Sequence, residues 1–63
     1  MQRVYDKINK ATENDMRNIN FWKEIIDICN DVRANSISIK DLSKAEQYFV
    51  RASYIIGKLG GEI

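Results

Sequence analysis

The chain has 63 residues, of which 44% are hydrophobic and 30% are charged, and its 10 basic and 9 acidic side chains give a formal net charge of +1. This composition is typical of a folded domain, and the charge balance gives no global bias towards nucleic acid or a membrane surface. The chain contains one cysteine and no histidine, which excludes an internal disulfide and argues against a structural zinc site.

The small size predicts a single domain, 1–63, that needs help to be stable. A domain of this length buries only about 60% of the surface exposed by its unfolded chain. Small domains obtain extra stability from disulfides, metals or oligomerisation. Because the single cysteine and the lack of histidine argue against an internal disulfide and a structural zinc site, we expect a homodimer.

The N-terminal residues do not resemble a secretion signal, because Asp6, Lys7 and Lys10 interrupt any apolar run. The apolar stretches are also too short to cross a bilayer. A lone cysteine in a chain of this kind fits a reducing compartment, so we expect a cytoplasmic protein.

The N-terminal half predicts helix. From residue 19 to residue 32 the apolar side chains fall on one half of a helix and the polar side chains on the other. Val4, Tyr5 and Ile8 continue the pattern upstream, with an interruption at residues 12–15. We favour one long helix over residues 2–34, because Asn and Asp each weaken a helix by less than about 1 kcal/mol. The alternative is a kinked or split helix, with Thr12 or Asn14 capping the second part.

Residues 35–40 predict a break between two helices. Asn35 is suited to the left-handed conformation that ends a helix, and Ser38 with Asp41 matches a capping box. Ile37 and Leu42 have the spacing of a hydrophobic staple. A second helix is expected from about Ile39 to Leu59, where Gly60 and Gly61 provide a stop.

The predicted fold is therefore all-α: a helical hairpin, pairing in a dimer as a four-helix arrangement. In the second helix, the apolar positions alternate by three and four residues, with Ala45 and Ala52 permitting close approach of the first helix. The antiparallel register places Asp31 opposite Lys44 and Glu24 opposite Arg51, which predicts charge pairing between the two helices, within one chain or across the dimer.

Apolar residues remain outside the predicted hairpin seam. They lie on one side of both helices and predict an aromatic-rich patch of the kind that anchors protein interfaces. In the alternative with a split first helix, a separate N-terminal helix folds back over this patch. The predicted protein-interface residues are Phe21, Ile28, Tyr48, Tyr54 and Ile55.

No active-site constellation is present in the sequence. Cys29 has no histidine to activate it and lies on the apolar face of its helix, which predicts a buried thiol of raised pKa. The pair Asp27 and Asp31 is too common a spacing to indicate a metal site, and no glycine-rich phosphate loop occurs. We expect no cofactor and no enzymatic activity.

Two functions remain. The first is a small regulatory or accessory protein that binds an as yet unidentified protein partner through its helix surfaces, and the frequent Ile, Asn and Lys suggest an AT-rich source such as a phage or a low-GC bacterium, hence a phage-encoded inhibitor. The alternative is a dimeric nucleic-acid-binding module, whose phosphate contacts are Lys44, Arg51 and Lys58.

Overall fold

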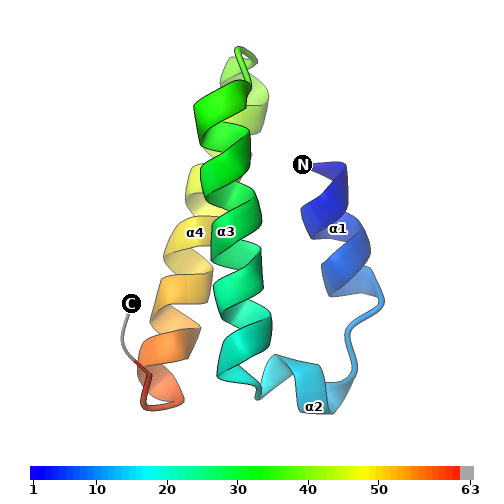
Figure 1. The fold of residues 1–63 in the computed structure, drawn as a ribbon, viewed down its shortest axis with the longest axis vertical. Helices are drawn as coiled ribbons and strands as arrows, with labels where there is room; N and C mark the ends of the chain where they lie inside the picture. The colour runs from blue at the N-terminus through cyan, green and yellow to red at the C-terminus, as the bar shows by residue number, and fades with distance from the viewer. Residues whose placement is uncertain (62–63) are drawn as a thin grey trace.

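The computed structural model describes residues 1–61, and within them every regular element is an α-helix (Figure 1). The two longest helices pack side by side as an antiparallel hairpin, which confirms the all-α hairpin predicted from the sequence. The four helices are α1 (Gln2–Asn9), α2 (Glu13–Met16), α3 (Ile19–Asn35) and α4 (Ile39–Lys58).

The prediction of one continuous helix over residues 2–34 is wrong, because two caps divide it. Thr12 begins α2 with a complete capping box: its side chain accepts the N–H of Asp15, and the Asp15 carboxylate accepts the N–H of Thr12. The side-chain oxygen of Asn18 accepts the N–H of Asn20 and begins α3. Each cap satisfies N–H groups that a helix start leaves unpaired, so the polar interruption starts new helices instead of being absorbed into one.

The Trp22 side chain fixes α2 against α3. Its indole N–H donates a 2.8 Å hydrogen bond to the carbonyl oxygen of Met16. This bond satisfies a carbonyl at the end of α2, and it directs the chain upstream of α2 back along the hairpin, where α1 lies beside α3 (Figure 1).

The connection between α3 and α4 differs in detail from the prediction. Ser38 caps α4 as expected, with its side chain accepting the N–H of Asp41 at 3.4 Å. Ile37, however, is 99% exposed and forms no staple. Asn35 is not left-handed, since no non-glycine residue described has a positive φ; its side-chain amide instead donates to the carbonyl oxygen of Asp31.

The end of α4 is as predicted. Gly60 has a φ of +86°, the left-handed conformation that glycine adopts at low cost. The N–H of Gly61 then reaches the carbonyl oxygen of Ile56, and the N–H of Gly60 reaches that of Gly57. These two bonds form a Schellman motif that satisfies the last carbonyls of the helix.

The core lies between α3 and α4. Ala45 and Ala52 are completely buried and separate larger side chains along α4, so the two long helices approach closely. The other buried side chains of this core come mainly from α3 and are joined by one residue of α1: Val4, Phe21, Trp22, Ile25, Ile26, Cys29 and Ile56.

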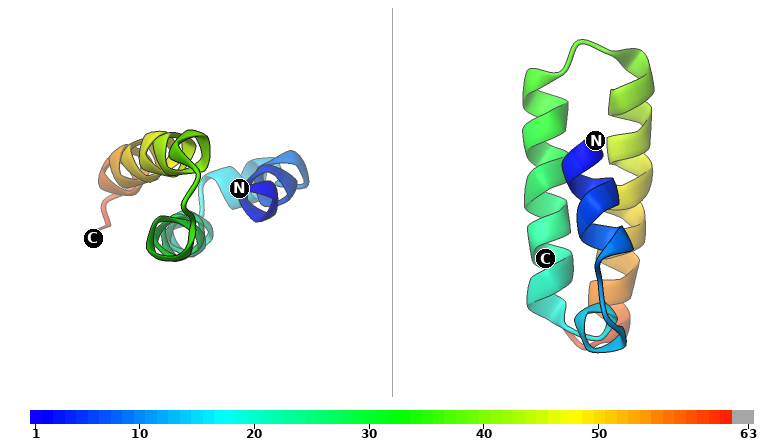
Figure 2. Two further views of the ribbon diagram at one scale, coloured as in Figure 1. Left: turned by 90° about the horizontal axis from the view of Figure 1, so that it is seen from above. Right: turned by 90° about the vertical axis from the view of Figure 1, so that its right-hand side faces the viewer.

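Helix α1 lies along one face of the hairpin (Figure 2). Val4 is its only buried residue. The Tyr5 ring meets the Tyr48 ring of α4 edge-on, with centroids 5.8 Å apart. The helix is therefore attached through one buried side chain and a few peripheral contacts, far fewer than those that join α3 to α4. None of the helices in residues 1–61 combines the length and apolarity that a bilayer span requires.

Candidate functional surfaces of the hairpin

The predicted aromatic patch is largely covered by α1, as in the split-helix alternative. Phe21 is 8% exposed and belongs to the core, so the expectation that it stands free on the surface is wrong. Ile28, Tyr48 and Ile55 are half-buried and pack against the core from its edges. Tyr54 alone among the five predicted residues is well exposed, at 64%. The five residues therefore do not form one continuous exposed patch.

The predicted ion pairs between α3 and α4 are also absent, because α1 supplies other partners. An Arg3 guanidinium nitrogen lies 3.1 Å from an Asp31 carboxylate oxygen, and the Lys7 ammonium pairs with the Glu24 carboxylate. These carboxylates were expected to face Lys44 and Arg51. The sequence pattern did not reveal this exchange, since it depends on α1 folding back.

Lys44 and Arg51 form no ion pair within residues 1–61. Both line a shallow hollow of about 250 Å³ on α4, together with Gln47 and Tyr48. Lys58 continues the same side of the helix, and its ammonium lies 5.3 Å from the centre of the Tyr54 ring. We call Lys44, Arg51 and Lys58 the cationic row.

The chemistry of the cationic row suits an anionic group. Lys and Arg side chains only donate hydrogen bonds, and the amide of Gln47 and the hydroxyl of Tyr48 add further donors between them. Lys44 and Arg51 are seven residues apart, so their backbone positions are about 10.5 Å apart along the helix. The spacing matches two acidic groups on a partner separated by two helical turns.

A second hollow adjoins the first. It is lined by Ser43, Glu46 and Val50 in addition to Gln47 and Arg51, which it shares with the first. Val50 is 61% exposed. The α4 surface thus combines cations with exposed apolar side chains, a mixture that a bare phosphate chain does not use and a protein interface does.

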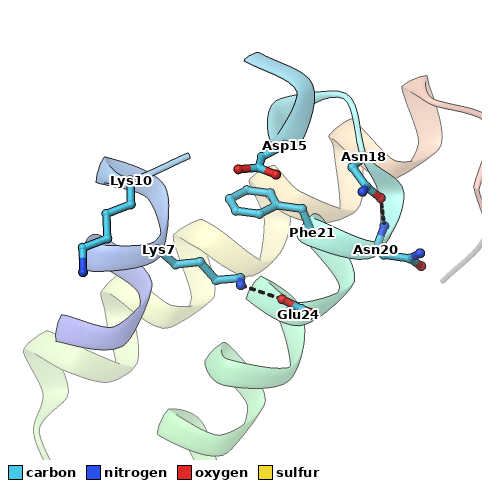
Figure 3. Close-up of a pocket in the computed structure, with 7 residues that line it drawn as sticks. All are labelled: Lys7, Lys10, Asp15, Asn18, Asn20, Phe21 and Glu24. Atoms are coloured by element: carbon cyan, nitrogen blue, oxygen red, sulfur yellow. Dashed lines mark hydrogen bonds and ion pairs between the residues drawn. The ribbon is translucent and has the colours of Figure 1, made fainter. Parts of the chain in front are cut away.

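The hollow between α1, α2 and the start of α3 is a weaker candidate (Figure 3). The Asp15 carboxylate lies beside the Phe21 ring, and most of the polar side chains are already committed: Lys7 to Glu24, Asp15 to the cap of α2, and Asn18 to the cap of α3. Polar groups that hold the fold together in this way are poorly placed to receive a ligand.

Cys29 is completely buried. Burial raises the pKa of its thiol above the ordinary value of 9.0, an effect that the positive charges of the N-terminus and Arg33 partly oppose. The thiol therefore stays protonated near neutral pH and lies out of reach of solvent. The prediction of a buried thiol with a raised pKa is confirmed.

In comparisons with known proteins, no family model matches the chain, and neither the curated proteins nor the solved structures contain a significant match. Functional inference therefore rests on the surfaces themselves. Gln47 and Val50 are not among the residues predicted from the sequence, although helical geometry places Val50 beside Ser43 and Tyr54 on the face of α4 that the core seam leaves free.

Proposed function

We propose that this is a non-enzymatic regulatory or accessory protein that binds an acidic protein partner through α4. The contact surface consists of the cationic row and the neighbouring exposed side chains of Gln47, Val50 and Tyr54. The observation that carries the proposal is that Lys44 and Arg51 line one hollow without a carboxylate of residues 1–61 paired to either.

The physical support is complementarity of both charge and apolarity. Carboxylates of a partner that meet Lys44 and Arg51 gain ion pairs that the chain does not already provide, and they steer the encounter. Tyr54 and Val50 offer apolar area beside these cations, and Tyr and Arg are over-represented among residues that dominate binding energies. Binding of this kind blocks or bridges surfaces of the partner and needs no chemistry.

The proposal extends to a cytoplasmic setting in a phage or a low-GC bacterium. The support is the single buried thiol, which a reducing compartment suits, and the frequent Ile, Asn and Lys of the sequence. An inhibitor encoded by a phage is one form of this proposal, in which the acidic partner belongs to the host.

A photo-crosslinking side chain at Gln47 tests the proposal, because this residue borders both hollows. The protein is incubated with an extract of a low-GC bacterium, the crosslinked protein is identified, and its purified form is titrated by calorimetry. We expect the double variant Lys44→Gln, Arg51→Gln to lose about tenfold or more in affinity, since charged contacts at an interface are worth over 1 kcal/mol.

The matched control is Lys10→Gln with Lys23→Gln, which removes the same charge from two other exposed positions. This variant should bind as the wild type does. Equal loss in both variants would mean that net charge alone matters, and undiminished binding by the Lys44 and Arg51 variant would place the contact elsewhere and refute the proposal.

Nucleic acid is the second candidate, favoured by the same unpaired cations. A duplex or single strand contacting the cationic row would release counterions, so the logarithm of its affinity should fall steeply with the logarithm of salt concentration. Titration with a fluorescent RNA and a DNA duplex at several salt concentrations separates the two candidates. Micromolar binding with a salt slope that decreases in the Lys44 and Arg51 variant would favour nucleic acid.

A further inference from the structure

Helix α1 is held on the hairpin by few interactions. Val4 is its only buried side chain. Its two ion pairs with α3 lie at the surface, where such pairs add little to stability. A helix of eight residues is also too short to persist alone in water. Helix α1 is therefore helical only while it is docked, and it undocks more readily than the two long helices separate.

The face of the hairpin under α1 is aromatic and acidic. The Lys7 ammonium lies 5.3 Å from the centre of the Phe21 ring, and the Tyr5 ring meets the Tyr48 ring edge-on. In the right-hand view of Figure 2, α1 lies in front of the two long helices. Undocking of α1 uncovers aromatic side chains of the kind that anchor protein interfaces. The α1-binding face consists of Phe21, Glu24, Ile28 and Asp31 of α3 with Tyr48 of α4.

The α3 edge of the α1-binding face carries more negative charge than α1 neutralises. Glu24 and Asp31 each pair with one cation of α1. Asp27 lies between them in the sequence and lines a hollow of about 280 Å³ between α1 and α3. In the part of the chain that the structure describes, no cation forms an ion pair with Asp27. This edge can therefore accept a further cation that α1 does not supply.

Helix α1 also covers only part of the length of α3. It has eight residues beside the 17 of α3, which correspond to about 12 Å and about 25 Å. Its first cation, Arg3, pairs with Asp31 near the end of α3, and its second, Lys7, pairs nearer the start. The two helices therefore run antiparallel. A longer helix in the same orientation would contact more of α3 than α1 does.

We propose that the α1-binding face docks a cationic amphipathic helix of a partner protein, and that α1 is a resident helix which this partner displaces. The partner helix runs antiparallel to α3, with Arg or Lys along the edge that meets the carboxylates and apolar side chains towards Phe21 and Tyr48. Undocking of α1 must precede binding, so the apparent affinity is reduced by the fraction of molecules in which α1 is undocked. The cationic row takes an acidic surface, so this site goes beyond the proposed function.

A synthetic peptide in which the sequence of residues 3–9 occurs twice is the probe, because it repeats the cations and apolar side chains of α1 over a longer helix. Titrated into the isotopically labelled full chain, it should shift the amide resonances of residues 21–31 and speed hydrogen exchange in residues 4–10. Val4→Asp removes the buried anchor of α1 and should bind the peptide about fivefold or more tightly than the wild type does, because no docked helix has to leave.

Charge reversal tests the carboxylate edge. Glu24→Lys with Asp31→Lys should weaken binding of the cationic peptide about tenfold or more. A peptide with Glu in place of its Arg and Lys residues should bind this variant and not the wild type. The matched control is Lys44→Gln with Arg51→Gln, which lies outside the α1-binding face and should bind the cationic peptide as the wild type does. The amide spectrum of each variant checks that the hairpin is folded.

If Val4→Asp does not fold, Arg3→Glu with Lys7→Glu replaces it, since this variant loosens α1 by repulsion and keeps the buried side chain. Peptide binding that leaves residues 4–10 protected, no gain in affinity when α1 is loosened, or equal affinity of the wild type for the two peptides would each overturn the proposal. A wild-type dimer in sedimentation equilibrium that dissociates when α1 is loosened would also overturn it, because α1 of a second copy would then be the occupant.

Discussion

The indole N–H of Trp22 and the carbonyl oxygen of Met16 are joined by a 2.8 Å hydrogen bond at the junction of α2 and α3. It ties the end of α2 to the first turn of α3, while the Trp22 ring packs edge-on against Phe21 beneath α1. One side chain therefore connects the core of the hairpin with the segment that folds back over it.

Replacing Trp22 with Phe should destabilise the protein by about 2–3 kcal/mol, because the Met16 carbonyl loses its partner and a smaller ring leaves a void. Urea unfolding followed by circular dichroism measures the loss. Phe49→Leu, at a half-buried position on the other long helix, should cost less. A smaller loss for Trp22→Phe than for Phe49→Leu would contradict the importance given to the hydrogen bond.

Replacing Val4 with Asp should detach α1 and leave the hairpin folded. Val4 is the one fully buried side chain of α1, and a carboxylate in its place would be buried without a partner. Hydrogen exchange should show fast amides in residues 4–10 and protection retained in α3 and α4. Gln2→Asp, at an exposed position of the same helix, should leave α1 protected; global unfolding by Val4→Asp would show that α1 is needed for the hairpin.

The Cys29 thiol should make stability depend on alkaline pH. Because burial raises its folded pKa above 9.0, the unfolded chain loses the thiol proton first. Stability contributed by the buried thiol is complete below pH 9.0 and is lost as the pH rises from there through the folded pKa. Unfolding midpoints of wild type and Cys29→Ala, measured from pH 7 to pH 10.5, should converge at high pH. If the two curves of midpoint against pH stay parallel, the pKa of the Cys29 thiol is not raised in the folded protein.

Replacing Ala52 with Leu should cost about 1–3 kcal/mol, since Ala52 is completely buried where α3 and α4 approach each other. The added side chain forces the two helices apart. Asn30→Leu introduces the same side chain at an exposed position of α3 and should change the free energy of unfolding by less than about 0.5 kcal/mol. If Ala52→Leu left the free energy of unfolding unchanged, α3 and α4 would have space for a larger side chain at their contact.

The hairpin could be predicted because its signals are local and consistent. The apolar alternation of α4, the cap at Ser38 and the stop at Gly60 act within a turn or two of the residues that carry them. The break at Thr12 was visible as an alternative, but helix propensity alone does not decide between a cap and a continued helix. Propensities there differ by less than about 1 kcal/mol, and in the structure the capping box formed by Thr12 and Asp15 starts a new helix at this position.

The contact surface was harder to predict because it depends on which residues pair across the fold. The predicted antiparallel register placed Asp31 and Glu24 opposite cations of α4. In the structure these two carboxylates pair with Arg3 and Lys7 of α1, and the sequence pattern does not indicate this pairing. Lys44 and Arg51 are exposed on α4 and pair with neither carboxylate. The exposure of Val50 and Tyr54 could be predicted from the sequence, since the two residues share a helix face, but the predicted patch combined Tyr54 with residues that are buried or half-buried in the fold.

The short connection between α3 and α4 is a position at which the chain could be cut into two fragments. Residues 36–38 contribute no buried side chain, and Ile37 stands almost wholly in solvent. The buried side chains shared by the two long helices lie outside this connection, so a chain cut there keeps both halves of its core. The fragments 1–36 and 37–63 are thus suited to reassemble when mixed, with each half serving as a template for the other.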